Sequence, residues 1–458
     1  MFTLGLGTSF RLVPIMSFMS VAAMLADVAK GQTVFIYQKP EVLDFTTSGK
    51  AEVVVCGQEG NEVRVSLDKE NVLVLWSILQ FSIFGAGRKV IGWNLKSLFS
   101  YLRYYGGKDF KAEGALIDLK IIESYLGIAK LAPDSLAQAL GRVRAIFNSG
   151  LWDGVQKVYK RIHLPLLTTV IPALETRRLL DLRLQSPVHA HYQIDGQENG
   201  RLKCDKAFAL GFVPHALSAE DRENITPPGL DEIFLYFDFK NMEVAMLQWL
   251  SGDERLGEIL KSAPDFYTAV FEIVVGKKCE DRDIAKKFFL PTIYGQSPNA
   301  LAEKLNIAFD TAQAIVSRVY DLFPQATGWV DNIQGEVEVH RTAKDYFGRR
   351  REFPDKAYLV RNFVVQAPAS TICLDKLIQL HRSVTVAFHI HDGYVVLATK
   401  GTWQSVYKTA KGILESESEL CPGLGLKVNC KAGRSLNKLK SIGRKATNED
   451  SIRSVPDS

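Results

Sequence analysis

The sequence predicts a mixed fold, in which an α/β region is followed by an α+β region. Over the first 128 residues, strand-forming runs alternate with helical patterns, which is typical of α/β domains. A continuous apolar run at 233–237 precedes an amphipathic helical pattern and predicts a strand that is buried on both faces. Alternating residues at 384–396 predict a β-hairpin with Asp392-Gly393 at its turn. With 458 residues, of which 47% are hydrophobic, the chain is long enough for two or three cores.

Composition narrows the class of protein. The net charge of +5 permits a polyanionic partner without requiring one. The six cysteines form no C-x-x-C pair, which favours reduced thiols in a cytoplasmic protein over disulfides or a zinc site. The apolar run at 12–29 predicts a buried helix, because Asp27 interrupts it and only Arg11 supplies the positive charge of a signal peptide. No later segment has the length and apolarity of a membrane span, so no membrane association is expected.

Two aspartates stand where predicted strands end. Asp238 follows the buried strand, and Asp392 lies at the hairpin turn. If the two strands are neighbours, the carboxylates share one cleft, and their repulsion is relieved by protonation or by a metal ion. Hard oxygen ligands suit Mg²⁺ held jointly with a phosphate-bearing substrate, and two such ions promote in-line phosphoryl transfer. Arg282 and Lys286 share one helical face and would neutralise a triphosphate. Taken singly, these residues are equally consistent with turns, caps and a solvated helix face.

The order of the motifs resembles the bacterial DNA polymerase I family (family A). "DFKNMEVAMLQWLSGD" resembles motif A of that family, "RDIAKKFFLPTIYG" resembles motif B, and "HIHDG" resembles motif C. "HAHYQIDGQENGRL" matches the family's H-T-S-x-x-Q-x-x-T-A-T-G-R-L segment at equal length from His189 to Arg201. The resemblance extends over about residues 160–430 and implies a right-hand polymerase fold with palm and fingers.

The resemblance also implies a domain order. It comprises a degenerate, ribonuclease H-like 3′-5′ exonuclease domain (1–128), a helical connection with a vestigial thumb (129–188), palm with motif A (189–262), fingers with motif B (263–360), palm with motif C (361–430), and a basic tail expected to be disordered (431–458). Leu98 stands at the aspartate of the exonuclease motif, which predicts that proofreading is absent. The short thumb predicts weak DNA binding, because most contacts with the DNA phosphates would be missing. A protein partner or the basic tail would supply these contacts.

Individual residues acquire roles through the same resemblance. Asp238, Asp392 and Lys286 would be catalytic, and the two aspartates with the Phe239 carbonyl would hold two Mg²⁺ ions. Nucleotide contacts are implied for Arg282, Lys286, Leu290, Tyr294, Glu243 and Tyr267. DNA contacts are implied for Arg201, His391, Gln366 and Arg361. Glu243 would crowd the 2′ position of the incoming sugar and so favour deoxynucleotides. Among the positions that depart from the family, Leu290, Pro291 and Gly393 replace its Phe, Gly and Glu.

The implied function is a template-directed DNA polymerase that binds primer-template and deoxynucleoside triphosphates. Two alternatives stay open: an enzyme similar to single-subunit RNA polymerases, and a non-catalytic protein that docks primer-template in a replication complex. A compact chain without proofreading and with little thumb suggests a virus or plasmid, which would place the protein in the host cytoplasm.

Overall fold

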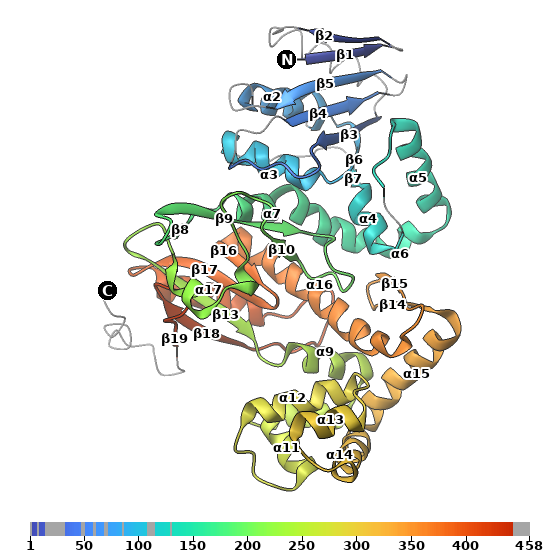
Figure 1. Ribbon diagram of the computed structural model, residues 1–458, viewed down its shortest axis with the longest axis vertical. Helices are drawn as coiled ribbons and strands as arrows, with labels where there is room; N and C mark the ends of the chain where they lie inside the picture. The colour runs from blue at the N-terminus through green and yellow to red at the C-terminus, as the bar shows by residue number, and fades with distance from the viewer. Residues whose placement is uncertain are drawn as a thin grey trace. The chain divides into compact units, whose positions relative to one another are not determined.

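The computed structural model divides the chain into two compact units (Figure 1). Unit 1 comprises Met1–Asp238, Leu374–Ile413 and Asn429–Ser458, and unit 2 comprises Phe239–Cys373 and Leu414–Val428. The residues that the structure describes are 2–6, 9–13, 33–46, 51–57, 61–67, 72–84, 87–107, 115–128 and 131–442. Most of the predicted N-terminal helix, from residue 14 onward, lies outside them.

A seven-stranded sheet organises the N-terminal part of unit 1. Its strand order is β2-β1-β5-β4-β3-β6-β7. The bounds are β1 Phe2–Leu6, β2 Ser9–Val13, β3 Thr33–Lys39, β4 Ala51–Cys56, β5 Glu62–Leu67, β6 Lys89–Gly92 and β7 Leu116–Asp118. The strands β3, β6 and β7 run parallel, and the remaining neighbours are antiparallel. The valine and isoleucine side chains of β3 and β4 are fully buried, as their sequence predicts. The alternating α/β region is therefore confirmed.

Helices pack around this sheet and lead away from it. The first set is α2 Val72–Leu79, α3 Leu95–Gly106, α4 Leu119–Tyr125 and α5 Leu136–Asn148. A longer helical stretch then runs from α6 Leu151–Val158 through two π-helical turns, Tyr159–His163 and Leu166–Val170, to α7 Ile171–Glu175. The helix α3 packs against both β3 and α7. The amphipathic pattern of residues 164–184 predicts that this helix continues to Leu184. That prediction is wrong, because Leu179–Asp181 form strand β8 paired with Ser186–Val188.

Two further sheets complete unit 1. A small sheet contains β8 Leu179–Asp181, β9 Ser186–Gln193, β10 Lys203–Asp205, β11 Gly211–Phe212 and β12 Ile225–Thr226, with the short helix α8 Ala219–Asn224 before the last strand. The second sheet has the order β16-β17-β13-β18-β19, and its bounds are β13 Glu232–Phe239, β16 Thr385–Ile390, β17 Gly393–Thr399, β18 Val428–Gly433 and β19 Lys440–Ser441. Helix α17 Trp403–Glu415 follows β17. The predicted buried strand is thus the central strand of the second sheet.

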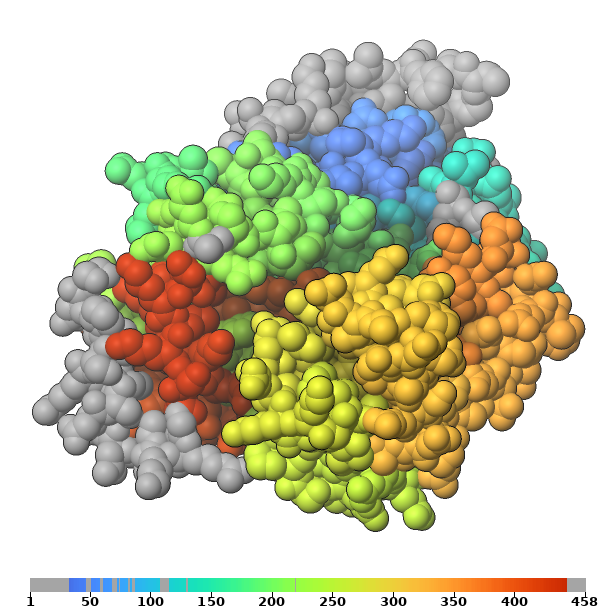
Figure 2. Space-filling model, turned by 60° about the horizontal axis from the view of Figure 1, so that its bottom comes forward, coloured from blue at the N-terminus to red at the C-terminus, as the bar shows by residue number. Residues whose placement is uncertain are grey.

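Unit 2 is mostly helical, and Figure 2 shows the surface of its residues in colours from yellow-green to orange. Its helices pack against one another. They are α9 Met242–Ser251, α10 Glu254–Ser262, α11 Phe266–Val275, α12 Arg282–Ile293, α13 Pro298–Leu305, α14 Phe309–Leu322 and α15 Pro324–His340. The hairpin of β14 Thr342–Lys344 and β15 Arg350–Glu352 follows, and then α16 Val360–Ser383, which continues into unit 1. Helix α12 continues for two residues beyond Pro291 and ends at Ile293, so the proline lies close to the end of the helix.

The expected start of a disordered tail at residue 431 is wrong. Strand β18 continues to Gly433, and β19 pairs with it through Lys431 and Ala432. Residues of β18 alternate between buried and exposed along most of the strand, as expected for a strand with one face toward the core. The basic composition of this segment does not predict a strand. None of the helices among the described residues combines the length and apolarity needed to cross a bilayer.

Candidate functional site

Strand pairing brings the two predicted metal ligands to one edge of a sheet in unit 1. Strands β13 and β17 are antiparallel neighbours, and Asp238 lies opposite Gly393. Asp392 directly precedes Gly393, so the two aspartates are neighbours across the strand pair. Both side chains are half-buried. Residues opposite each other in a sheet lie about 4.5–5.5 Å apart. This register therefore supports the expectation that two strands far apart in the sequence bring Asp238 and Asp392 together.

The turn that carries Asp392 differs from the expected one. Ile390 pairs with Gly393, so the two loop residues are His391 and Asp392. His391 takes the left-handed backbone conformation, with φ of 54°. Asp392-Gly393 was expected to form the turn because both residues tolerate positive φ. Instead, Gly393 is the first residue of β17.

A close contact explains the glycine. A Cβ atom at Gly393 would lie 2.7 Å from the Tyr236 hydroxyl and 2.8 Å from the ring, so no side chain fits without a shift. The Tyr236 hydroxyl lies 3.5 Å from Oδ1 of Asp238. Burial, followed by the charges of Asp238 and Asp392, raises the pKa of Tyr236, so its phenol stays neutral near the two carboxylates. The ring of Tyr236, from the neighbouring strand, therefore occupies the space that a side chain at position 393 would need.

The donors at this edge fit Mg²⁺. They are two carboxylates with the backbone carbonyl of Phe239 next along β13, which are hard oxygen ligands. Within the described part of the chain, no cluster of three or more His, Cys, Asp or Glu side chains forms a metal site by itself. Magnesium commonly keeps water and substrate phosphate among its ligands, so two protein carboxylates suffice.

Arg201, His391 and His215 form the polar surroundings of this edge. The His391 ring lies 5.3 Å from the His215 ring, centroid to centroid. The pKa of His391 is lowered by burial and then by the charge of Arg201, while Asp392 opposes the shift. Arg201 is therefore close enough to influence the charge of the turn. His215 was not anticipated, and its position after a short loop carries no sequence signal.

Glu243 is held by two partners within unit 2. It lies in the first turn of α9, and its Oε2 accepts a hydrogen bond from the Tyr294 hydroxyl at 2.7 Å. Its Oε1 accepts from Nε2 of Gln366 at 3.1 Å. Three of the predicted contact residues, taken from motif A, motif B and helix α16, thus meet in one hydrogen-bonded group. The sequence implied the three roles separately and did not predict their direct contact.

The basic face of α12 is arranged as its four-residue spacing predicts. Arg282 and Lys286 are exposed, whereas Leu290 is half-buried nearer the end of the helix. Arg282 pairs with Asp265 at 2.7 Å, and its guanidinium lies 5.8 Å from the centroid of the buried Tyr267 ring. Asp265 was missed as a partner, although it begins helix α11 as an N-cap residue. A phosphate that binds Arg282 would share it with this carboxylate.

Arg361 does not suit its implied role in DNA contact. Its side chain is buried, and its guanidinium donates to Asp331, Gln334 and the Tyr320 hydroxyl. It also donates to the carbonyl of Ile293 at 3.4 Å. A guanidinium engaged in this way joins α12, α14, α15 and α16 within unit 2. We therefore correct its role to support of the helical unit.

In the N-terminal module, which we define as the seven-stranded sheet with helices α2–α5, buried carboxylates make contacts that stabilise the fold. Leu98, at the position of the exonuclease aspartate, is fully buried in α3. Asp118 is buried, and its oxygens accept the backbone N–H groups of Leu95 at 2.8 Å and Asn94 at 3.3 Å. Burial raises the pKa of Asp118 to about 6, against the opposing effect of these hydrogen bonds. The buried carboxylate of Glu123 is paired with Arg142.

Comparison with known proteins agrees with the motifs. The sequence profile of DNA polymerase family A matches residues 161–438. DNA polymerase I, thermostable, from Thermus aquaticus is 25% identical over 217 residues, which is 43% of this chain and 26% of that protein. DNA polymerase I from Streptococcus pneumoniae serotype 4 (strain ATCC BAA-334 / TIGR4) is 24% identical over 259 residues, which is 51% of this chain and 29% of that protein.

The chain thus spans roughly a quarter of the length of these relatives. A solved structure described as the POL domain of Pol1 from M. smegmatis, in complex with DNA primer-template and dNTP, has a similar fold. Its TM-score is 0.68 at 12% identity, with 93% of this chain and 99% of that chain covered. Because the profile matches more than half of the sequence in one uninterrupted stretch, the chain belongs to DNA polymerase family A.

Proposed function

We propose that this protein is a template-directed DNA polymerase that adds deoxynucleotides to the 3′ end of a primer. The observation that carries the proposal is the register of β13 and β17, which makes Asp238 and Asp392 neighbours at one sheet edge. In this proposal, residues 189–262 and 361–430 act as palm and residues 263–360 act as fingers. Family membership, together with the fold shared with a polymerase domain, supports the same function.

Each part of the site has a physical task in phosphoryl transfer. Asp238 and Asp392 would hold two Mg²⁺ ions, assisted by the Phe239 carbonyl, and Mg²⁺ bound there would supply charge neutralisation for phosphoryl transfer. Arg282 and Lys286 bind the triphosphate through their exposed cationic groups. Glu243 lies against the sugar and excludes a 2′-hydroxyl. Little covalent chemistry is asked of the protein, because catalysis of phosphoryl transfer consists mainly of positioning and charge neutralisation.

The N-terminal module is proposed to lack nuclease activity. A two-metal nuclease needs carboxylates that face its substrate. Here Leu98 is buried, and Asp118 and Glu123 are engaged in contacts within the module. Only ten residues separate α7, which ends at Glu175, from β9, which begins at Ser186. This short connection supports a reduced thumb, hence weak DNA binding and the use of a protein partner.

Primer extension tests the proposal and separates it from the two alternatives. Purified protein, a primer-template duplex and Mg²⁺ are incubated with deoxynucleotides or with ribonucleotides. Template-dependent extension with deoxynucleotides is expected. Preferential use of ribonucleotides would instead indicate an RNA polymerase-like enzyme, and no extension with either Mg²⁺ or Mn²⁺ would indicate a docking protein. Long products from a single binding event at physiological salt would contradict the need for a partner.

A further inference from the structure

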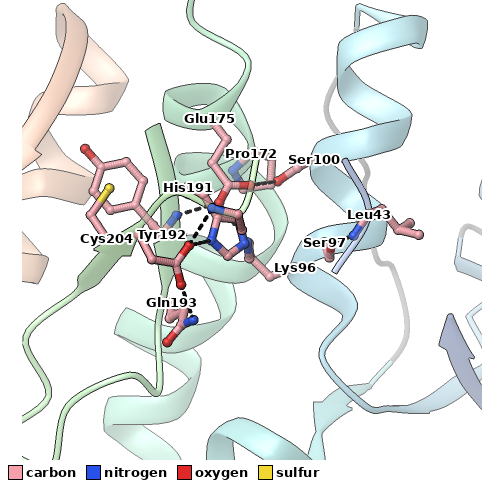
Figure 3. Close-up of polar contacts among 12 residues, drawn as sticks. Leu43, Lys96, Ser97, Ser100, Pro172, Glu175, His191, Tyr192, Gln193 and Cys204 are labelled. Atoms are coloured by element: carbon pink, nitrogen blue, oxygen red, sulfur yellow. Dashed lines mark hydrogen bonds and ion pairs between the residues drawn. The ribbon is translucent and has the colours of Figure 1, made fainter. Parts of the chain in front are cut away.

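A buried polar cluster joins the N-terminal module to the small sheet of unit 1. Figure 3 shows Lys96 and Ser100 from α3, Glu175 from α7 and His191 from β9 directed toward one another. The Lys96 ammonium lies 2.7 Å from Oε1 of Glu175, and the Ser100 hydroxyl donates to the other carboxylate oxygen. Lys96 is 4% exposed and Glu175 is 0% exposed. A charge pair this deeply buried needs hydrogen bonds to its charged groups. The cluster provides two acceptors for the Lys96 ammonium and two further donors for the Glu175 carboxylate.

The hydrogen-bond roles of the cluster follow from its chemistry. Nε2 of His191 lies 3.0 Å from Nζ of Lys96, which has only donors, so Nε2 accepts. The proton of His191 is then on Nδ1, which donates to Oδ1 of Asp205 at 2.7 Å. Burial and then the charge of Lys96 lower the pKa of His191, so the ring is neutral in this arrangement. The cluster thus has one defined set of donors and acceptors.

The cluster continues into the catalytic hairpin through Tyr192. Oε1 of Glu175 accepts the backbone N–H of Tyr192 at 2.8 Å. The Tyr192 hydroxyl accepts the backbone N–H of His389 at 3.0 Å and donates to the carbonyl of the same residue at 3.2 Å. Tyr192 is 1% exposed. His389 lies in β16, three residues before Asp392.

Among the strands that the structure describes, β17 alone neighbours β16, which makes β16 an edge strand of its sheet. An edge strand leaves every second pair of backbone N–H and C=O groups without a partner in the sheet. At His389 a single phenol satisfies both groups. It fixes the strand just ahead of the turn, where His391 takes its left-handed conformation. A strained two-residue turn keeps one conformation only if the flanking strands hold it.

We propose that the hydroxyl of Tyr192 positions the hairpin that carries Asp392, and that the Lys96–Glu175 pair anchors this hydroxyl to the N-terminal module. Tyr192 is a positioning residue, since it reaches Asp392 only through the backbone of β16. The N-terminal module, which is proposed to lack nuclease activity, would then have the task of holding the polymerase hairpin in place. This inference rests on the proposed polymerase function for its kinetic consequences.

Tyr192→Phe tests the proposal with a matched control in the same unit. Tyr159 is also buried, and its hydroxyl likewise accepts the backbone N–H of Asp118 at 2.8 Å and donates to the carbonyl of Leu116 at 3.2 Å. Tyr159→Phe therefore removes the same chemistry far from the hairpin in sequence. Hydrogen exchange is measured on peptides covering 385–399 and 115–121, together with the kcat and KM of single-nucleotide extension and the Mg²⁺ concentration for half-maximal rate.

For Tyr192→Phe we expect exchange to accelerate about tenfold in 385–399 and kcat to fall about tenfold, because positioning is lost. The KM for the deoxynucleotide should stay unchanged, and more Mg²⁺ should be needed. Tyr159→Phe should accelerate exchange only in 115–121 and leave kcat and the Mg²⁺ requirement as in wild type. Equal kinetic effects of the two variants, or wild-type exchange in 385–399 for Tyr192→Phe, would overturn the proposal.

The anchoring step has its own test. The double variant Lys96→Met/Glu175→Gln removes the charges while Gln keeps an acceptor for the Tyr192 N–H. It should accelerate exchange in 385–399, and adding Tyr192→Phe should accelerate it little further, because the groups act in series. Fully additive effects would refute the anchor. If the wild type extends no primer, the proposed function fails, whereas the exchange measurements still decide whether Tyr192 holds the hairpin.

Discussion

The hydroxyl of Tyr294 donates a hydrogen bond of 2.7 Å to Oε2 of Glu243. With Gln366 bonded to the other oxygen, the carboxylate is fixed from two sides within unit 2. A residue that excludes a hydroxyl by its size must be held in place, since a mobile side chain moves aside. The pairing therefore gives a physical reason why Glu243 would be able to select deoxynucleotides in the proposed function.

Removing this carboxylate should weaken sugar discrimination. We expect Glu243→Ala to raise the use of ribonucleotides relative to deoxynucleotides by about 10- to 100-fold, in the range that pocket contacts provide. Tyr294→Phe should cause a smaller change, because the carboxylate remains but loses one partner. Competing single-nucleotide incorporations measure the ratio of kcat/KM values. Glu243→Gln, which retains the size, is the control, and wild-type discrimination by Glu243→Ala would contradict the assignment.

Of the two adjacent lysines of α12, Lys286 and Lys287, only Lys286 should contribute to nucleotide binding. Both Lys286 and its neighbour Lys287 are exposed, but only Lys286 shares a helical face with Arg282. Lys286→Ala should lower kcat/KM for the nucleotide by about 10²- to 10³-fold, because a charge that stabilises the transition state is lost. Lys287→Ala should leave it within about twofold. Similar losses in both variants, measured by single-turnover incorporation, would show a general charge effect instead.

Local patterns predicted the elements on which the site depends. The apolar run before Asp238 and the alternation around Asp392 identify β13 and the β16–β17 hairpin, because burial on two faces and strand periodicity leave direct traces in the sequence. The amphipathic stripe after Asp238 likewise identifies α9. These elements are determined by residues close together in the chain.

Features that depend on distant partners were not predictable in the same way. Gly393 was expected to form a turn, but the ring of Tyr236 from a neighbouring strand decides its role. Strand β8 reads as the end of a helix until β9 pairs with it. Arg361 matched a DNA contact by motif, whereas Asp331 and Gln334 engage it in the folded unit. Tertiary pairing overrides local preference in all three cases.

Removing one charge of the buried Lys96–Glu175 pair should destabilise the protein more than removing both. Lys96→Met leaves Glu175 as an unpaired buried carboxylate and should lower the free energy of unfolding by about 3–5 kcal/mol. Lys96→Met/Glu175→Gln removes both charges and should recover most of that loss. Urea denaturation followed by circular dichroism measures both variants. A double variant that is less stable than the single variant would show that the pair itself stabilises the fold.

Asp118 should give the stability a characteristic pH dependence. Its pKa is raised by burial from an ordinary 3.8 to about 6 in the folded protein. The folded state thus binds the proton more tightly, so the stability contributed by protonated Asp118 is present below pH 4 and lost as the pH rises through 6. Asp118→Asn should remove a decrease of about 2 kcal/mol between pH 4 and pH 7. Urea denaturation at several pH values checks this, and parallel pH curves for wild type and variant would refute it.

The most direct test of the account is the rate of single-nucleotide incorporation by Asp392→Asn with saturating Mg²⁺. Asn keeps the size of the side chain but removes the negative charge that Mg²⁺ requires. Asp231→Asn, an exposed position just before β13, is the control. The account predicts that Asp392→Asn binds primer-template as wild type does and loses at least about 10³-fold in rate, while Asp231→Asn is unaffected. A rate for Asp392→Asn within tenfold of wild type would contradict it.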